Sequence, residues 1–226
     1  MTLSVLEKDC AIGCFTHRNT YIGYLQESAK KFLPEIPFIT VINNAEIADN
    51  MSLLRDKFIE TGKRFVVYMD DDIMFLNSTI IKDAIETLVK YKAGICTVYS
   101  TFDVGSLNAP YDAKGKGLVE RYHNYAVGYF ILCDQEKVGH ILPDKSLPFK
   151  NTAVDASFSV AARADGWSIV ISPNYVYHLW KNTKANMEQI EPTNAYLMNK
   201  YGRFYFDYSQ YGGCCIEWGL GAGNAV

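Results

Sequence analysis

The sequence predicts a single α/β domain with a mainly parallel central sheet flanked by helices and a smaller antiparallel element in its second half. Three observations support this fold class. Strand-like and helix-like segments alternate through the first hundred residues, which is typical of parallel sheets with right-handed crossovers. The 226 residues are enough for one large core. The composition, 49% hydrophobic and 21% charged, is that of an ordinary globular protein.

The first half of the chain is expected to contain four strands separated by three helices. Each strand is a short apolar run, and each helix shows apolar residues three and four positions apart. Strands are expected at 11–15, 38–42, 65–69 and 95–99. Helices are expected from Thr20 to a stop at Pro34, over 47–58 with its end at Gly62, and over 81–88 with a cap at Asn77 or Ser78.

The second half is less regular. Residues 100–117 are rich in Gly, Ser, Asn and Asp and are too long for a passive connection, so they are expected to form a lid or to be disordered. The remaining elements are strands near 118–124 and 127–133, a short helix around 134–140, a helix from about 155 to 165, and a strand at 168–172 that leads through Pro173 into 175–180. The aromatic residues beyond 200 are interpreted as a packing tail, with an acceptor or oligomer surface as the minority view.

Charge and cysteine content exclude some classes of function. The net charge of −3 and the pI near 5.8 give no general attraction to nucleic acid or anionic membranes, although a local basic patch stays open. The six cysteines are scattered without zinc-ligand spacing and are expected to pack as small apolar residues. The chain shows no signal peptide and no apolar run of about 18 residues. We therefore expect a cytoplasmic protein without a transmembrane segment.

Three consecutive aspartates, Asp70, Asp71 and Asp72, directly follow the apolar run 65–69. Open α/β sheets hold ligands at the carboxyl ends of such buried strands. Adjacent carboxylates repel one another unless a cation or solvent screens them, and their hard oxygen atoms suit Mg²⁺ or Mn²⁺. The triplet predicts a divalent metal site, with a solvated acidic turn as the alternative.

Four sequence features together resemble a known enzyme class. The segment 14–19 reads CFTHRN, and 68–72 reads YMDDD. Arg55 lies fifteen residues before Asp70, while Asp155 is followed by Gly166 eleven residues later and by Pro173 seven residues after that. This set resembles the GT-A class of nucleotide-sugar-dependent glycosyltransferases, a Rossmann-like fold, and most nearly its inverting family 2, over roughly residues 10–180. Val154 departs from the family's Glu-Asp motif, so only one of its two acids is present.

The resemblance implies a role for each of these positions. It implies Asp155 as the general base, Asp72 and Asp70 as metal ligands, and His178 as the carboxy-terminal histidine that completes the metal shell in several GT-A families. The donor contacts that it implies are Thr16, Arg18 and Asn43 at the base, Asp70 at the ribose or a water-bridged metal, Arg55 on the preceding helix, and Lys184 at the diphosphate, with Lys181 and Trp180 beside it. Asp71 is a further donor-site candidate, with a side chain that points elsewhere as the alternative. The alternatives are a helix cap for Asp155, a structural hydrogen bond for His178 and solvated surface lysines.

The expected activity is therefore transfer of a hexosyl or pentosyl group from a nucleotide-diphosphate sugar, with a UDP-sugar favoured and guanine left open. The acceptor is a hydroxyl group on a glycan, a lipid-linked saccharide, a protein or a modified nucleic-acid base. Residues 10–100 would bind the nucleotide, 118–180 the acceptor, and 181–226 would add a C-terminal helix and the aromatic tail. A sugar nucleotidyltransferase is less favoured because no Gly-rich phosphate loop follows the first strand. An aspartate-nucleophile phosphatase is also less favoured, and a non-catalytic nucleotide-sugar-binding homologue stays open because of Val154.

Overall fold

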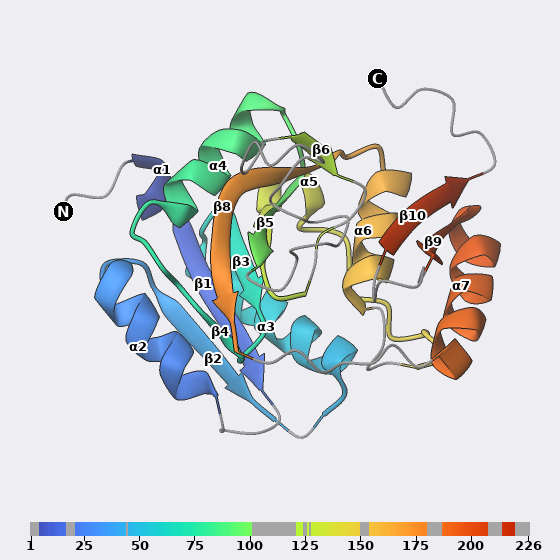
Figure 1. The fold of residues 1–226 in the computed structure, drawn as a ribbon, viewed down its shortest axis with the longest axis horizontal. Helices are drawn as coiled ribbons and strands as arrows, with labels where there is room; N and C mark the ends of the chain where they lie inside the picture. The colour runs from blue at the N-terminus through green and yellow to red at the C-terminus, as the bar shows by residue number, and fades with distance from the viewer. Residues whose placement is uncertain are drawn as a thin grey trace.

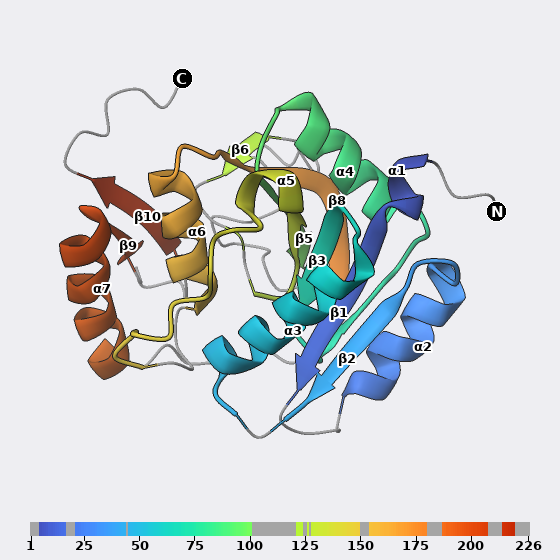
Figure 2. The same ribbon diagram turned by 180° about the vertical axis from the view of Figure 1, so that it is seen from behind.

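Helices cover both faces of one mixed β-sheet (Figures 1 and 2). The computed structural model describes residues 5–16, 21–43, 45–100, 121–123, 126, 128–149, 154–179, 187–207 and 214–219. Within these ranges the sheet has eight strands, seven of them in the order β2–β1–β3–β7–β5–β8–β4, with β6 paired to β8. No helix in the described ranges is both long and apolar enough to cross a membrane.

Most of the strands run in one direction. The parallel set is β1 (Cys10–Thr16), β2 (Phe38–Ile42), β3 (Phe65–Met69), β5 (Ile95–Ser100) and β8 (Ile169–His178). β7 (Ile131–Asp134) is inserted antiparallel between β3 and β5, and both β4 (Ile73–Met74) and β6 (Arg121–His123) run antiparallel to β8. The predicted mainly parallel sheet with a smaller antiparallel element is confirmed.

Two helices lie on each face of the sheet. One face carries α2 (Ile22–Phe32) and α4 (Ile80–Lys90), and the other carries α3 (Ile47–Thr61) and α6 (Val154–Ala164). The remaining elements are α1 (Val5–Lys8), α5 (Gln135–Val138), α7 (Met187–Tyr201) and an antiparallel hairpin of β9 (Arg203–Asp207) and β10 (Cys214–Gly219). Helix α7 packs beside α6, so the C-terminal part of the chain extends the α6 side of the molecule (Figure 1).

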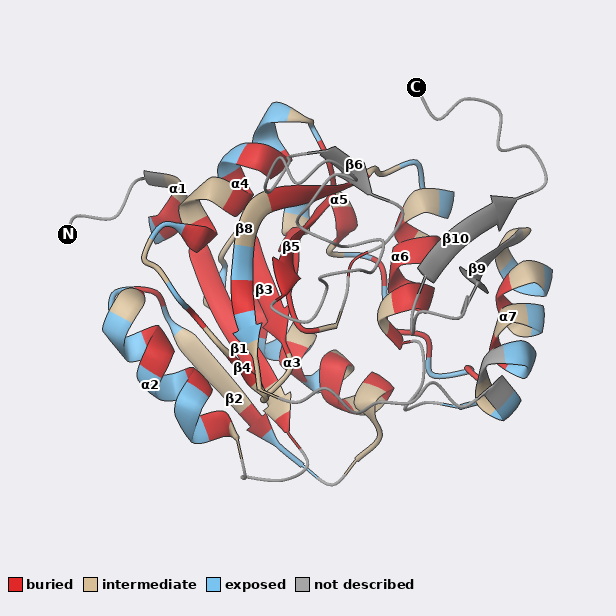
Figure 3. Ribbon diagram, in the orientation of Figure 1, coloured by how far each residue is buried: buried red, intermediate tan, exposed pale blue. Residues whose placement is uncertain are grey.

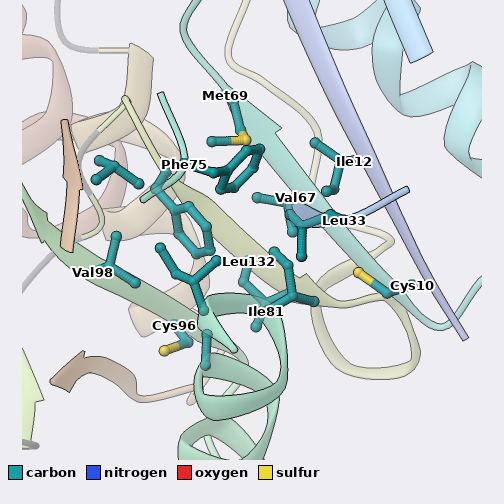
Figure 4. Close-up of a cluster of buried hydrophobic side chains, with 14 of the residues drawn as sticks. Cys10, Ile12, Leu33, Val67, Met69, Phe75, Ile81, Cys96, Val98 and Leu132 are labelled. Carbon is teal, nitrogen blue, oxygen red and sulfur yellow. The ribbon is translucent and has the colours of Figure 1, made fainter. Parts of the chain in front are cut away.

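Two apolar clusters join the sheet to its helices. The central strands β1, β3 and β5 are buried along their length (Figure 3). On the α2–α4 face, Met69 and Phe75 pack with residues of neighbouring strands (Figure 4). Four cysteines whose side chains the structure describes, at positions 10, 14, 96 and 133, are buried free thiols. Burial raises the pKa of Cys10 and Cys133, so these thiols stay protonated and pack as apolar side chains, as expected.

Local signals locate most of the first-half elements correctly. Helix α3 ends at Gly62, whose φ of 64° is the left-handed conformation that glycine adopts readily. The predicted cap of α4 is wrong, because the helix begins only at Ile80 and the Asn77 side chain accepts a hydrogen bond from the Thr79 N–H in the preceding turn (3.0 Å).

The differences are larger in the second half. The strands expected at 168–172 and 175–180 form one strand, β8, with Pro173 inside it. The β9–β10 hairpin was not predicted, because its aromatic residues resemble a packing tail. Residues 101–117, expected to be a lid or disordered, lie outside the described ranges.

Candidate functional site

The aspartate triplet lies where β3 ends. All five residues of β3 are buried, and Asp70, Asp71 and Asp72 connect it to β4. The chain turns there because β4 pairs with β8, whereas β3 pairs with β1 and β7. The three carboxylates therefore start from the carboxyl end of a central strand, the edge at which open α/β sheets hold ligands.

Backbone pairing brings His178 to Asp72. Ile73 and His178 are partners in the antiparallel β4–β8 ladder, and the Leu179 N–H donates to the Asp72 carbonyl (2.7 Å). The side chains also meet, with His178 Nε2 3.2 Å from Asp72 Oδ1. The Tyr129 ring lies against the imidazole, with 5.6 Å between ring centroids. Sheet topology thus joins Asp72 and His178, two of the three residues that were expected as metal ligands.

Asp71 contacts a different strand. The Thr16 hydroxyl, at the end of β1, donates a hydrogen bond to the Asp71 carboxylate. The Thr16 carbonyl accepts from the N–H of Asn43, which follows β2 (3.2 Å). The Asn43 side chain bonds within its own loop, where its Oδ1 accepts a hydrogen bond from the Ala45 N–H (3.2 Å). Of the two residues expected at the nucleotide base, Thr16 contacts the triplet directly, and Asn43 is joined to it through the Thr16 backbone.

Asp155 lies in the first turn of α6 and is held by two backbone amides. Its Oδ1 accepts from the Ala156 N–H (2.8 Å) and its Oδ2 from the Gly128 N–H (3.0 Å). The first contact lies within the first turn of α6, where Asp155 is the second helical residue and not the residue that precedes the helix, whereas the second contact reaches the turn before β7. Ser159 on α6 makes another link to the same turn, because its hydroxyl accepts from the Ala126 N–H (3.0 Å). The Asp155 carboxylate is therefore held jointly by helix α6 and by Gly128, and Ser159 ties the same helix to Ala126.

Gly128 lies between Asp155 and Asp70. A Cβ atom placed on this glycine would lie 3.4 and 3.6 Å from the two Asp70 carboxylate oxygens and 3.5 Å from Asp155 Oδ2. A single point is therefore within van der Waals distance of both carboxylates. The expected base and the first residue of the triplet face the same small volume.

Negative charge is concentrated in this volume. Burial, followed by the charge of Asp72, raises the pKa of Asp70 to about 7; Asp155 acts in the same direction and His178 opposes it. Burial also raises the pKa of Asp155, although its backbone N–H donors lower it. Since buried carboxylates destabilise a fold unless their charge is balanced, this site favours a cation.

The raised pKa of Asp70 predicts how stability depends on pH when metal is absent. A group whose pKa is higher in the folded state stabilises the fold below its unfolded pKa, and this contribution is lost as pH rises through the folded pKa. For Asp70 the window runs from the ordinary aspartate pKa to about 7. In EDTA, the Tm should therefore be higher at pH 5.5 than at pH 8, and Asp70→Asn should reduce this difference. Asp56→Asn, at an exposed carboxylate, is the matched control; an equal pH dependence in both variants would contradict the assignment.

Two residues of the site were not identified from sequence. The pattern predicts a strand over 127–133, but Gly128 and Tyr129 form a turn and β7 begins only at Ile131. The available signal was a glycine between a polar loop and an apolar strand, which often marks a close approach to the backbone. Tyr129 is fixed beside His178 because its hydroxyl donates to the Val98 carbonyl (2.9 Å).

The structure gives Arg55 a different contact from the expected one. Its Nε and Nη2 both donate to the Gly139 carbonyl (3.0 and 2.7 Å), so this arginine ties α3 to the turn after α5. This contact is structural, and the expected donor contact of Arg55 stays a prediction. The other cationic candidates, Arg18 and Lys184, lie outside the described residues, as do Lys181 and Trp180.

The side chains around Asp72 are of the right type for a divalent cation. Carboxylate oxygens and imidazole nitrogens both coordinate Mn²⁺ in proteins, and a cation would balance the negative charge of the carboxylates around Asp70. In the described ranges, however, no three His, Cys, Asp or Glu side chains are arranged as a metal-binding group. Asp72 and His178 contact each other instead, so a cation would have to replace that contact.

Solved structures of other proteins share this fold. GalNAc-T7, solved with UDP, GalNAc and Mn²⁺, gives a TM-score of 0.61 at 9% identity over 84% of this chain and 47% of that one. The mannosyltransferase PcManGT from Pyrobaculum calidifontis, solved with GDP-Man and Mn²⁺, gives 0.54 at 8% identity over 78% and 58%. A197 from STIV gives 0.55 at 13% identity over 76% and 86%.

These similarities define the fold. No protein-family model and no curated protein sequence matches the chain. The chain spans about half the length of GalNAc-T7 and PcManGT. At such low identity the comparison establishes architecture, and the expected GT-A-like glycosyltransferase fold is confirmed.

Proposed function

We propose that this protein is a metal-dependent glycosyltransferase that moves a hexosyl or pentosyl group from a nucleotide-diphosphate sugar to an acceptor hydroxyl, with inversion. The observation that carries the proposal is the site at the end of β3. There Asp72 contacts His178, and Asp155 faces Asp70 across Gly128. The two glycosyltransferase structures with Mn²⁺ and a UDP or GDP ligand support the choice of cofactor and donor class.

The donor side is assigned to the first half of the chain, residues 10–100, together with His178. Asp72 and His178 would hold Mn²⁺ or Mg²⁺, with Asp70 as a further carboxylate ligand or a ribose contact. When bound, the cation would stabilise negative charge on the departing nucleoside diphosphate. Asp71 and its partner Thr16 would lie toward the nucleotide, near Asn43. We favour a UDP-sugar, and we keep Arg18 and Lys184 as donor contacts.

On the acceptor side, Asp155 would act as the general base. The acceptor hydroxyl gives its proton to this carboxylate while its oxygen bonds to the anomeric carbon and the bond from that carbon to the diphosphate breaks. The Gly128 and Ala156 N–H groups hold one carboxylate oxygen each, so the carboxylate is already oriented before the acceptor binds. Attack opposite the leaving group inverts the anomeric centre.

A methyl group at Gly128 should block this site without unfolding the protein. Its Cβ would make ordinary contacts of 3.4–3.6 Å with the Asp70 and Asp155 carboxylates, so Gly128→Ala should fold but fill the volume between them. We expect transfer to fall by at least about tenfold, since small displacements at reacting atoms have large effects. Gly23→Ala, on an exposed helix position with open space, is the matched control for a steady-state rate assay. Equal rates for the two variants would contradict the placement of the reacting groups.

The proposed function is tested with a panel of nucleotide sugars. Purified protein is incubated with each donor in Mn²⁺ or in EDTA, and both release of nucleoside diphosphate and transfer to glycan, lipid-linked and protein acceptors are measured. Metal-dependent turnover of at least one donor is expected, with the product anomer assigned by NMR. Absence of turnover for every donor would exclude the enzyme, and retention of the donor's anomeric configuration would exclude direct inversion.

A further inference from the structure

The pairing that places His178 beside Asp72 is short. The β4–β8 ladder consists of the pairs Ile73–His178 and Met74–Tyr177, extended by the hydrogen bond from Leu179 N–H to the Asp72 carbonyl. A slip of one residue along either strand would turn the His178 side chain to the opposite face of the ribbon. Because the ladder has only these backbone contacts, it specifies the register of β8 against β4 weakly. We therefore expect another part of the structure to help maintain that register.

β8 is also irregular just before this ladder. In its pairing with β5, Thr97 faces Ile171 and the next pair is Tyr99 with Tyr175. Between these two pairs β8 advances by four residues while β5 advances by two. The extra residues surround Pro173, which has no N–H to donate to the ladder. This bulge determines which residues of β8 arrive opposite β4. Any change in the bulge would therefore change the partner of Ile73.

A polar cluster of Asn77, Thr79, Asp83 and Asn174 lies at the bulge. Asn174 Nδ2 donates to Asp83 Oδ2 (2.8 Å), and Asn174 Oδ1 accepts from Asn77 Nδ2 (3.3 Å). The Thr79 hydroxyl donates to the same Asp83 oxygen (2.7 Å). Both ends of the Asn174 amide are thus bound by the segment that leads from β4 into α4.

The contact between Asn77 and Asn174 continues the register of the ladder. Asn77 lies three residues after Met74, and Asn174 lies three residues before Tyr177, the partner of Met74. The two asparagines therefore occupy facing positions on antiparallel segments, beyond the last backbone pair. Their hydrogen bond is compatible with this register, and a one-residue slip would separate them.

We propose that Asn174 is a positioning residue for the metal site: its bonds to Asn77 and Asp83 hold β8 in register against β4, and this register keeps His178 beside Asp72. The effect of Asn174 on metal binding rests on the proposed function. The effect of Asn174 on the β4–β8 register does not, because it concerns the backbone of the metal-free protein.

The test exchanges the donor and acceptor of one hydrogen bond. Asn174→Asp removes the donor and places a carboxylate next to that of Asp83. Adding Asp83→Asn restores a donor–acceptor pair, and the new side chains can still accept from Asn77 and Thr79. Asp83→Asn alone keeps an acceptor for both Asn174 and Thr79 and is the matched control. Asn174→Ala, which removes the bonds without repulsion, is a milder second variant.

Two readouts are measured, hydrogen exchange of the Leu179 amide in EDTA and the Kd for Mn²⁺ by calorimetry. Asn174→Asp should expose the Leu179 amide to faster exchange and weaken Mn²⁺ binding by about tenfold or more, as for other residues that orient metal ligands. Asn174→Ala should change both in the same direction. The double variant should restore both, and the control should match the wild type.

The outcomes separate this inference from the proposed function. Unchanged Leu179 exchange in Asn174→Asp and Asn174→Ala, or a double variant that regains the wild-type Tm without regaining Leu179 protection, would overturn the positioning role. If the wild-type protein bound no Mn²⁺, the proposed metal site and the metal half of this inference would both fail. The exchange data would still decide whether Asn174 sets the register.

Discussion

Asp155→Asn is expected to lower the rate of sugar transfer by about 10²–10⁴-fold, the usual contribution of a general base. The asparagine amide has nearly the shape of the carboxylate but cannot take the acceptor's proton. Its oxygen can accept from only one of the two N–H groups, of Gly128 and Ala156, that now bind Asp155. The measurement is single-turnover transfer at saturating donor and Mn²⁺, which reports the chemical step rather than binding.

The interpretation of this variant depends on binding and stability being preserved. Losing one hydrogen bond destabilises the fold, but removing the charge of a buried carboxylate has the opposite effect, so we expect only a small change in Tm. Donor affinity in Mn²⁺ should stay at the wild-type value, and the exposed Asp56→Asn variant should transfer at the wild-type rate. Full activity of Asp155→Asn would show that the proton goes elsewhere and would leave Asp155 with a structural role, as the acceptor of the Gly128 and Ala156 N–H groups.

Local sequence signals explain why the first half of the fold was predictable. β-branched and aromatic runs, the stop at Pro34 and the left-handed Gly62 act within a few residues, so the elements they define can be identified without knowing the tertiary structure. Pro173 shows how tertiary pairing acts on a local signal. The proline has no N–H to donate to a ladder, but pairing with β5, β6 and β4 keeps β8 continuous, and the proline lies in a bulge. Tertiary pairing overrides local preference at that position.

The site residues also separate into those that local sequence signals identify and those that depend on tertiary contacts. Position at the end of a buried strand was enough to single out the triplet, whereas the contact between Asp72 and His178 depends on the non-local β4–β8 pairing and was expected only from the resemblance. Spacing from the triplet did not predict the hydrogen bonds of Arg55 to the Gly139 carbonyl, because this contact joins segments that are far apart in the sequence. For Gly128 the only signal was its place between a polar loop and an apolar strand, because its role comes from its amide and its lack of a Cβ and not from a side chain.

The valine at position 154, where the resembled motif has an acid, has a structural explanation. Val154 is 4% exposed and belongs to the apolar cluster on the α3–α6 face. An ionised side chain at that position would be buried without water, at a large cost in stability. The sequence change is therefore consistent with the packing, and Asp155 is the one acid of this motif that faces Asp70.

Asp72→Ala is expected to abolish Mn²⁺ binding and metal-dependent transfer while leaving the metal-free protein folded. The Asp72 carbonyl still accepts from the Leu179 N–H, because that bond belongs to the backbone, so the β4–β8 pairing does not depend on this side chain. The loss is instead a carboxylate beside His178, the contact that we assign to the cation. Mn²⁺ affinity is measured by calorimetry with and without nucleoside diphosphate, and the Tm in EDTA checks the fold.

The neighbouring aspartate supplies the matched control. Asp71→Asn keeps an oxygen that can accept from the Thr16 hydroxyl and removes one charge from the same triplet. If the effect of Asp72→Ala were only a general loss of negative charge, both variants would weaken Mn²⁺ binding equally. If Asp72 is a ligand, Asp71→Asn should weaken it far less. A larger loss for Asp71→Asn than for Asp72→Ala would assign the metal to the β1 side of the triplet and would separate His178 from the metal site.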